Sequence, residues 1–195
     1  YLETRGSWVF APHPQAVEGS VSGAQWAVGG GASVSWDAGD TWDYAVWDLP
    51  YRVTSSLGDV AYDSGLVIRA YEDQVLLGTA EAGVHVSLDR AETWGVSSGI
   101  PSTVDVVGLA RMGDVHVAAT AGNVEWSWPV YVSEDGGASW TLEDNDLPSD
   151  LELVSLVDAD DTVMALGRQV REDYTYDWSL WQRVEGTWHQ RLAFP

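Results

Sequence analysis

One eight-residue motif recurs along the chain and constrains the fold more than any other feature. Its shared form is Ser-x-Asp-x-Gly-x-Thr/Ser-Trp, and the complete copies end at Trp42, Trp94 and Trp140. These tryptophans are 52 and 46 residues apart. Weaker copies end at Trp8 and Trp188 and lack the Ser and the Asp. A near-constant spacing of this kind indicates an array of similar structural units.

Each residue type in the motif has a local structural use. An Asp carboxylate accepts hydrogen bonds from nearby backbone N–H groups and fixes a turn. Gly supplies a positive φ where the chain reverses, although Ala91 replaces it in the second copy. The Trp offers a large apolar face for packing between sheets. We therefore expect structural roles for the motif residues, which are Ser35, Asp37, Gly39, Trp42, Ser87, Asp89, Trp94, Ser133, Asp135, Gly137 and Trp140.

The motif resembles the Asp-box, also called the bacterial neuraminidase repeat. The three complete copies are a specific match, and the resemblance stays in phase over essentially the whole chain. It implies a hairpin turn between the third and fourth strands of a β-propeller blade. Such propellers occur in sialidases, sortilin-type receptors, xyloglucan-cleaving enzymes and photosynthetic assembly factors.

The segments between the motifs read as short alternating strands separated by turn residues, and no segment carries a helical period. Before the third motif we expect strands at 106–111 and 115–120, and in the compressed first unit at 19–21, 25–28 and 33–35. The predicted fold class is all-β, with blades of four antiparallel strands. The expected single propeller region, 1–195, comprises the end of a preceding blade at 1–12 and four blades at 13–50, 51–101, 102–148 and 149–195.

This blade count predicts an incomplete propeller. Closed propellers have about 4 to 8 blades, and the extra strands at 1–12 have no place in a ring of four. An open array would expose sheet edges and large apolar faces. We expect a longer parent protein, a partner chain or further copies to complete the propeller. The chain begins at Tyr1 without an initiator Met, so we also expect a mature or trimmed product.

The charge balance limits the partners. Nine Arg, no Lys and thirty acidic residues give a net charge of −21. Such a surface repels phosphate backbones and anionic lipids, so nucleic acid is not an expected partner. Two interpretations stay open: adaptation for solubility or a salty habitat, and a surface for cations or cationic partners. No apolar run reaches membrane-spanning length, and we expect an extracellular or cell-surface location without membrane insertion.

Catalytic, metal and cofactor sites are not predicted. Sialidases use an Arg cluster, a Tyr nucleophile with a Glu partner and an Asp acid/base, but no such set can be assigned here. The absence of Cys excludes a thiolate metal site. His85 and His116 fall in strands, where a half-buried structural His is the simpler interpretation. The acidic turns at 143–146 and 158–161 could offer oxygens to calcium but lack the spacing of a dedicated loop.

One group of aromatic residues suggests a role beyond holding the fold together. Loops between second and third strands, and loops between blades, lie on the face opposite the motif turns. The aromatic residues there are Trp47, Tyr51, Trp126, Trp128, Tyr174, Tyr176 and Trp178. They either pack between blades or form an interaction face for a protein or a glycan. We expect a non-catalytic interaction or assembly module; the alternative is a glycoside hydrolase of sialidase type, or a fragment of one.

Overall fold

The computed structural model describes most of the chain beyond the first motif. The described residues are 16–19, 25–29, 31–35, 40–41, 43–44, 51–53, 60–62, 65–71, 74–80, 82–89, 92–121 and 128–194. Side chains are described from Leu66 onward and at Asp40 and Thr41. Several expectations lie outside the described residues: the strands at 1–12, and Asp37, Gly39, Trp42, Trp47 and Trp126.

Four antiparallel sheets of four strands each follow one another in chain order, which confirms the predicted fold class. The first comprises β1 (Ala16–Gly19), β2 (Gln25–Gly29), β3 (Gly31–Ser35) and β4 (Asp43–Tyr44). The second comprises β7 (Gly65–Tyr71), β8 (Gln74–Thr79), β9 (Val84–Ser87) and β10 (Gly95–Val96). The third comprises β11 (Asp105–Met112), β12 (Val115–Ala121), β13 (Val130–Ser133) and β14 (Thr141–Leu142). The fourth comprises β15 (Glu152–Ala159), β16 (Thr162–Val170), β17 (Tyr176–Val184) and β18 (Thr187–Phe194).

Two details differ from the sequence expectation. The first strand begins at Ala16, three residues before the predicted strand at 19–21. A separate hairpin of β5 (Tyr51–Val53) and β6 (Val60–Tyr62) lies between the first and second sheets, where a plain connection was expected. No helix long and apolar enough to cross a membrane is found among the described residues.

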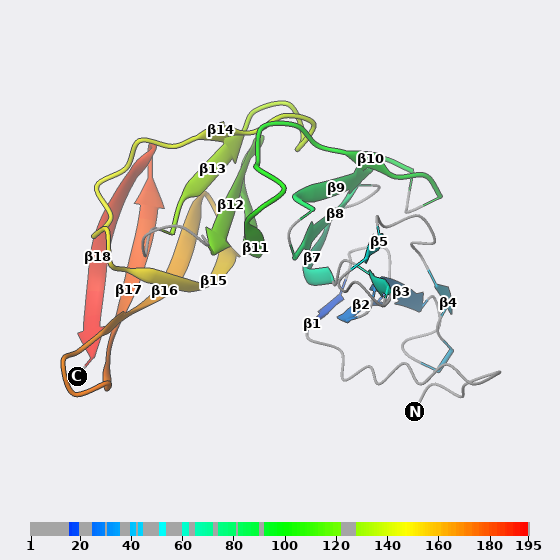
Figure 1. The fold of residues 1–195 in the computed structure, drawn as a ribbon. Helices are drawn as coiled ribbons and strands as arrows, with labels where there is room; N and C mark the ends of the chain where they lie inside the picture. The colour runs from blue at the N-terminus through cyan, green and yellow to red at the C-terminus, as the bar shows by residue number, and fades with distance from the viewer. Residues whose placement is uncertain are drawn as a thin grey trace.

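The sheets follow a curved path, and their first strands lie along its inner side (Figure 1). β7, β11 and β15 contact one another in sequence, and β1 contacts β7. Each of β7, β11 and β15 carries a register shift at the matching place, between Gly65 and Val67, Val106 and Gly108, and Leu153 and Ser155. A bulge bends its strand and increases the local twist. The repeated bulges show that these three sheets are built to one plan.

The core lies between consecutive sheets. Leu76 of the second sheet packs with Leu109, Ala118 and Tyr131 of the third. The other face of the third sheet packs on the fourth in the same way, through a cluster that includes Val117, Ala119, Val130, Leu153, Leu156, Ala165 and Trp181. Each fully buried Leu contributes about 1.5–3 kcal/mol by leaving water. Because each sheet is covered by its neighbour, the array gains stability sheet by sheet.

The turns after β9 and β13 have the same hydrogen bonds. The Asp135 carboxylate accepts bonds from the Ser133 hydroxyl at 2.8 Å, and from the backbone N–H (2.9 Å) and hydroxyl (2.5 Å) of Ser139. Asp89 makes the matching bonds to Ser87 and Thr93. These donors lower the pKa of both carboxyls to about 2. Each turn joins the third strand of its sheet to the fourth.

Gly137 shows why the third motif needs its glycine. Its φ is +85°, and a Cβ there would lie 2.7 Å from Leu76 Cδ2 on the preceding sheet. The Gly137 carbonyl also accepts a bond from Trp140 Nε1 at 3.1 Å. Both the turn and the packing of the buried Trp140 ring against the second sheet therefore depend on this position.

The fourth sheet forms the turn between its third and fourth strands without the motif residues. Glu185 and Gly186 both have positive φ, as a two-residue type I′ hairpin turn requires. Arg183 occupies the place of the motif Ser, because it pairs with Val163 as Ser133 pairs with His116. Its guanidinium donates to Glu143 Oε1 of the third sheet, and Trp188 Nε1 donates to Glu143 Oε2 at 2.9 Å. The Arg183 and Glu143 side chains are 7% and 8% exposed, so this is a buried ion pair.

A polar joint ties the inner strands of three sheets. The Tyr71 hydroxyl donates to Asp158 Oδ1 at 3.3 Å, and the Arg111 N–H donates to the same oxygen at 2.7 Å. The Arg111 guanidinium lies 4.1 Å from the centre of the Tyr71 ring. His116 packs edge-on against Tyr71, and its Nε2 lies 3.0 Å from Gln74 Oε1. Burial, Asp158 and the bond to it raise the pKa of Tyr71, so the hydroxyl stays protonated.

The first prediction concerns the motif Asp. Asp135→Ala removes the acceptor for three hydrogen bonds and should lower the melting temperature by several degrees. Glu134→Ala, one residue away on the same exposed turn, is the matched control and should change it little. Binding by the folded fraction should survive the Asp135 change. Loss of binding at unchanged stability would mean that this residue acts in function instead.

The second prediction concerns the buried pair. Arg183→Met leaves the Glu143 carboxylate buried without its cation and should lower the free energy of unfolding by about 3–5 kcal/mol. Adding Glu143→Gln removes that charge and keeps an acceptor for Trp188, so the double variant should recover most of the loss. Urea unfolding measures both. A double variant as unstable as the single one would show that packing, not charge, sets the effect.

The third prediction concerns pH. Burial, followed by the nearby Arg111, lowers the pKa of His116 to about 4, whereas Asp158, Asp114 and Asp135 oppose the shift. The unfolded chain binds this proton below about 6.5 and the folded chain only near 4, so stability is lost as pH falls between these values. The loss attributable to His116 should reach about 3 kcal/mol.

Unfolding free energies between pH 7.5 and 4 test this expectation. His116→Gln should flatten the slope, and the exposed His189→Gln should leave it unchanged. Burial also lowers the pKa of His85, so some dependence should survive in the His116 variant. An unchanged slope in His116→Gln would contradict the assignment.

Candidate functional site

The hairpin of β16 and β17 extends beyond the matching hairpins of the other sheets. β16 and β17 have nine residues each, whereas β8 and β9 have six and four, and β12 and β13 seven and four. The extension projects at the end of the sheet opposite β14 and the motif turns (Figure 1). We call residues 168–178 the aromatic arm. Its aromatic residues are Tyr174, Tyr176 and Trp178.

A row of four side chains crosses the fourth sheet at the base of the aromatic arm. The register pairs Glu152 with Arg168, Arg168 with Trp178, and Trp178 with Phe194. Residues directly opposite on neighbouring strands share one face. Leu153, Ala165 and Trp181 point to the opposite face, which packs on the third sheet. The row of four side chains therefore lies on the face that is turned away from the third sheet. We call it the outward face.

Arg168 organises this row. Its Nε and Nη2 donate to the two Glu152 carboxylate oxygens at 2.7 and 2.5 Å, a bidentate pair. Its guanidinium carbon lies 4.4 Å from the Tyr176 ring centre and 5.9 Å from that of Trp178. The Glu152 bonds raise the pKa of Arg168, so the cation persists. Arg is suited to this place because its planar cation can pair with a carboxylate and stack on rings together.

The tip of the aromatic arm is held by short-range polar contacts. Asp173 Oδ1 accepts bonds from the Thr175 backbone N–H at 3.1 Å and from its hydroxyl at 2.6 Å, and Arg171 forms an ion pair with Asp177. These contacts lower the pKa of Asp173 and Asp177. Tyr174 has a φ of +63° and is 86% exposed. A left-handed backbone conformation is uncommon for tyrosine. Together with the exposed ring at the loop tip, it suggests a role in function.

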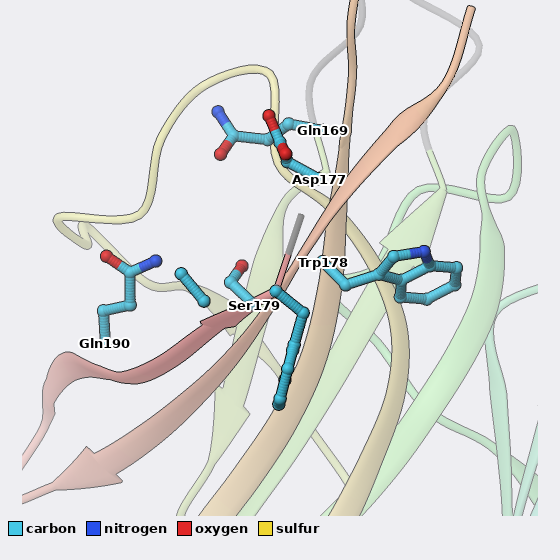
Figure 2. A pocket seen from close by; sticks show the side chains of 7 residues that line it. Gln169, Asp177, Trp178, Ser179 and Gln190 are labelled. Atoms are coloured by element: carbon cyan, nitrogen blue, oxygen red, sulfur yellow. The ribbon is translucent and has the colours of Figure 1, made fainter.

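A shallow hollow lies beside the aromatic arm. It has a volume of about 380 Å³ and is lined by Gln169, Asp177, Trp178, Ser179, Gln190, Ala193 and Phe194. In Figure 2 the polar ends of Gln169 and Asp177 lie near each other, with Gln190 on one side of β17 and the Trp178 ring on the other. Amide, hydroxyl and carboxylate groups beside aromatic rings can hydrogen-bond and stack a ligand at the same time.

The remaining aromatic residues named by the sequence are more scattered. Val130 pairs with Ala119 in the third sheet, and Leu180 pairs with Leu166 at the equivalent place in the fourth. Trp128 and Trp178 lie two residues before Val130 and Leu180. The two tryptophans thus hold matching places in successive sheets, away from the motif turns. Tyr51 begins β5 and pairs with Tyr62. Trp47 and Trp126 lie outside the described residues.

Sequence reasoning missed Glu152, Phe194 and Gln190. The signal for Glu152 was available: it and Arg168 flank the turn at 160–161 almost symmetrically, so a hairpin places them opposite each other. Phe194 and Gln190 gave no such signal, because the fourth strands of the other sheets are too short to predict a long β18.

The described carboxyl groups with a shifted pKa hold turns and ion pairs. Among the described carboxyl groups, each resolved pKa shift is downward, at Asp89, Asp135, Asp173 and Asp177. A glycosidase acid instead needs a carboxyl whose pKa is raised. Within the part of the chain that the structure describes, no group of three or more metal-ligating side chains comes together.

Comparison with known proteins gives information about the fold. No protein-family model matches the chain, and no curated protein matches it. Among solved structures, a GH74 xyloglucanase from Xanthomonas campestris superposes with a TM-score of 0.57 at 13% identity over 88% of this chain. An ancestral GH74 enzyme gives a TM-score of 0.53 at 12% identity over 91%. YCF48 from Cyanidioschyzon merolae gives 0.56 at 14% identity over 90%.

These neighbours are larger than the matched region. The chain spans 28% and 31% of the two GH74 chains and 54% of the YCF48 chain. Identities this low carry information about the fold and not about activity. Since these are β-propeller proteins and each sheet here has four antiparallel strands, the chain folds as a set of β-propeller blades that covers part of a propeller.

Proposed function

We propose that the chain is a non-catalytic interaction module that binds a protein or a glycan through the aromatic arm. The observation that carries the proposal is the Arg168 cation, held by Glu152 and covered by Tyr176 and Trp178, at the base of a projecting hairpin. This arrangement fixes large side chains before any partner arrives. Preorganised aromatic surface binds at a low cost in conformational entropy.

The chemistry of the aromatic arm fits both ligand classes. Tyrosine and tryptophan combine a broad apolar face with a polar edge, which suits stacking on sugar rings and filling pockets on protein surfaces. Both arginines of the arm are paired with carboxylates, whereas Glu172 and Asp173 give the exposed tip an acidic character. The polar hollow beside it adds hydrogen-bonding groups.

A glycoside hydrolase is the second candidate. Its support is the fold likeness to two GH74 proteins, one of them a xyloglucanase. Such an enzyme needs two carboxyls separated by roughly 5 to 9.5 Å, one of them with a raised pKa.

We also propose that further polypeptide completes the propeller, and that the module works outside the cell or at its surface. The partial coverage of the neighbours supports the first point. The outward face supports it too, because Val157 lies half exposed there, whereas the matching residue Ala110 of the third sheet is buried. The location rests on the acidic surface alone.

The fourth prediction tests the arm. Xyloglucan oligosaccharides and a panel of other neutral glycans are titrated calorimetrically, and a photo-reactive residue at position 174 traps a bound protein. Trp178→Ala should weaken the detected partner at least about tenfold, the loss expected for one stacked aromatic anchor. Leu88→Ala changes an apolar residue that is 72% exposed on a motif turn, and this control should bind normally.

The outcomes separate the two candidates. Release of reducing ends from xyloglucan by the wild-type chain would favour the hydrolase. Partner binding that Trp178→Ala and Tyr174→Ala both leave unchanged would contradict the proposed surface.

A further inference from the structure

We propose that the exposed edge of β18 docks an extended peptide of a partner protein, which adds to the fourth sheet as a fifth strand. This surface borders the aromatic arm, because Phe194 pairs with Trp178, but the proposal rests on the length and exposure of β18 itself. β18 has eight residues, whereas the fourth strands β4, β10 and β14 have two each. Only the fourth sheet therefore presents a long outer strand among the described residues.

The outer strands of the second and third sheets are short. Ser97, after β10, still bonds to Val84 (2.9 Å), and Ser98 then bonds to the next motif through Ala138 (3.1 Å) and Trp140 (2.9 Å). After β14 the Glu143 backbone N–H still bonds to Val130 (2.8 Å), and its side chain meets Arg183 and Trp188 of the fourth sheet. β18 instead continues to Phe194 with β17 as its neighbour in the sheet order. Seven of its eight residues are exposed, and only Trp188 is buried.

A long open edge carries backbone N–H and C=O groups ready to pair with another strand. Edges are usually blunted by short length, Lys or Pro. β18 has neither Lys nor Pro, and a register shift near Arg191 is its one irregularity. Beyond that shift, Leu192 and Phe194 lie 52% and 45% exposed on the outward face. The edge is therefore accessible and partly apolar.

The two faces beside the edge define the peptide. Successive side chains of an added strand point to opposite faces of the sheet. One set would lie beside Leu192 and Phe194, which favours aliphatic residues. The other set would lie beside Gln190 and Ala193, the residues of β18 that line the hollow from the opposite face. The Gln190 amide favours polar residues in this set.

Charge selects a foreign peptide over a second copy of this chain. The net charge of −21 makes two copies repel each other, and it attracts a basic segment and speeds its association. The expected partner segment thus alternates aliphatic and basic residues over the length of β18.

The probe is a fluorescein-labelled heptapeptide of alternating valine and lysine, titrated with the full chain by fluorescence anisotropy at physiological salt. We expect saturable binding. A version with N-methyl groups along one edge keeps the charge but loses strand pairing, and should bind at least about tenfold more weakly. Replacing lysine by glutamate should also abolish binding, because the charge is then repelled.

Matched variants locate the site. Leu192→Lys replaces the apolar contact of the docked valines with a charge and should weaken binding about tenfold. Val157→Lys changes a residue of similar exposure, 49%, on the same outward face but on β15, and should leave binding unchanged. Hydrogen exchange should slow in β18 on peptide addition, and Leu88→Ala on the motif turn of the second sheet should not remove this protection.

Three results would overturn the proposal. Equal binding of the N-methylated peptide would show simple electrostatic attraction. Protection confined to residues outside β18 would place the peptide elsewhere. A stable dimer of the isolated chain with β18 already protected would show that a second copy occupies the edge.

Discussion

The burial of one sheet against the next is the interaction on which the rest of this structure depends. A four-stranded sheet of this size cannot cover its own apolar side chains, so each sheet relies on its neighbour. Leu76 against Leu109, and Val117 against Leu156 and Trp181, are repeats of a single contact. The matching bulges in β7, β11 and β15 keep the inner strands in step. Among the described residues, the fourth sheet packs on the third through one face, and its outer strand β18 pairs with β17 alone.

Polar contacts then set the position of each sheet rather than its stability alone. The Asp-centred turns brace the second and third sheets, and the third motif contacts the segment after β10. In the fourth sheet the Arg183–Glu143 pair takes over that task. With the turn end fixed in this way, the opposite end is free to vary. That end carries the aromatic arm, the hollow and the end of β18. The features that differ from sheet to sheet therefore lie where the structure has few fixed contacts.

The turns and strands followed from local chemistry, and the site did so only in part. Asp89 and Asp135 sit beside their own hydrogen-bond donors in the sequence, so residue type and spacing were enough to place the turns. Tyr174, Tyr176 and Trp178 were all expected in the second-to-third strand loop, but only Tyr174 lies there, because β17 already begins at Tyr176. Arg183 and Glu143 are 40 residues apart, and no sequence feature near either residue predicts their contact. The extra length of β16, β17 and β18 was equally hidden, because alternation tells where a strand starts better than where it stops.

Amide hydrogen exchange on the isolated chain tests the central claim that the sheets form one continuous core with an open last edge. The account predicts slow exchange in β7, β11 and β15, which lie against one another, and in β16, which is paired on both sides. It predicts fast exchange for the β18 amides that do not bond to β17. Uniformly fast exchange in the inner strands would contradict the continuous core. Exchange in β18 as slow as in β16 throughout would contradict the open edge.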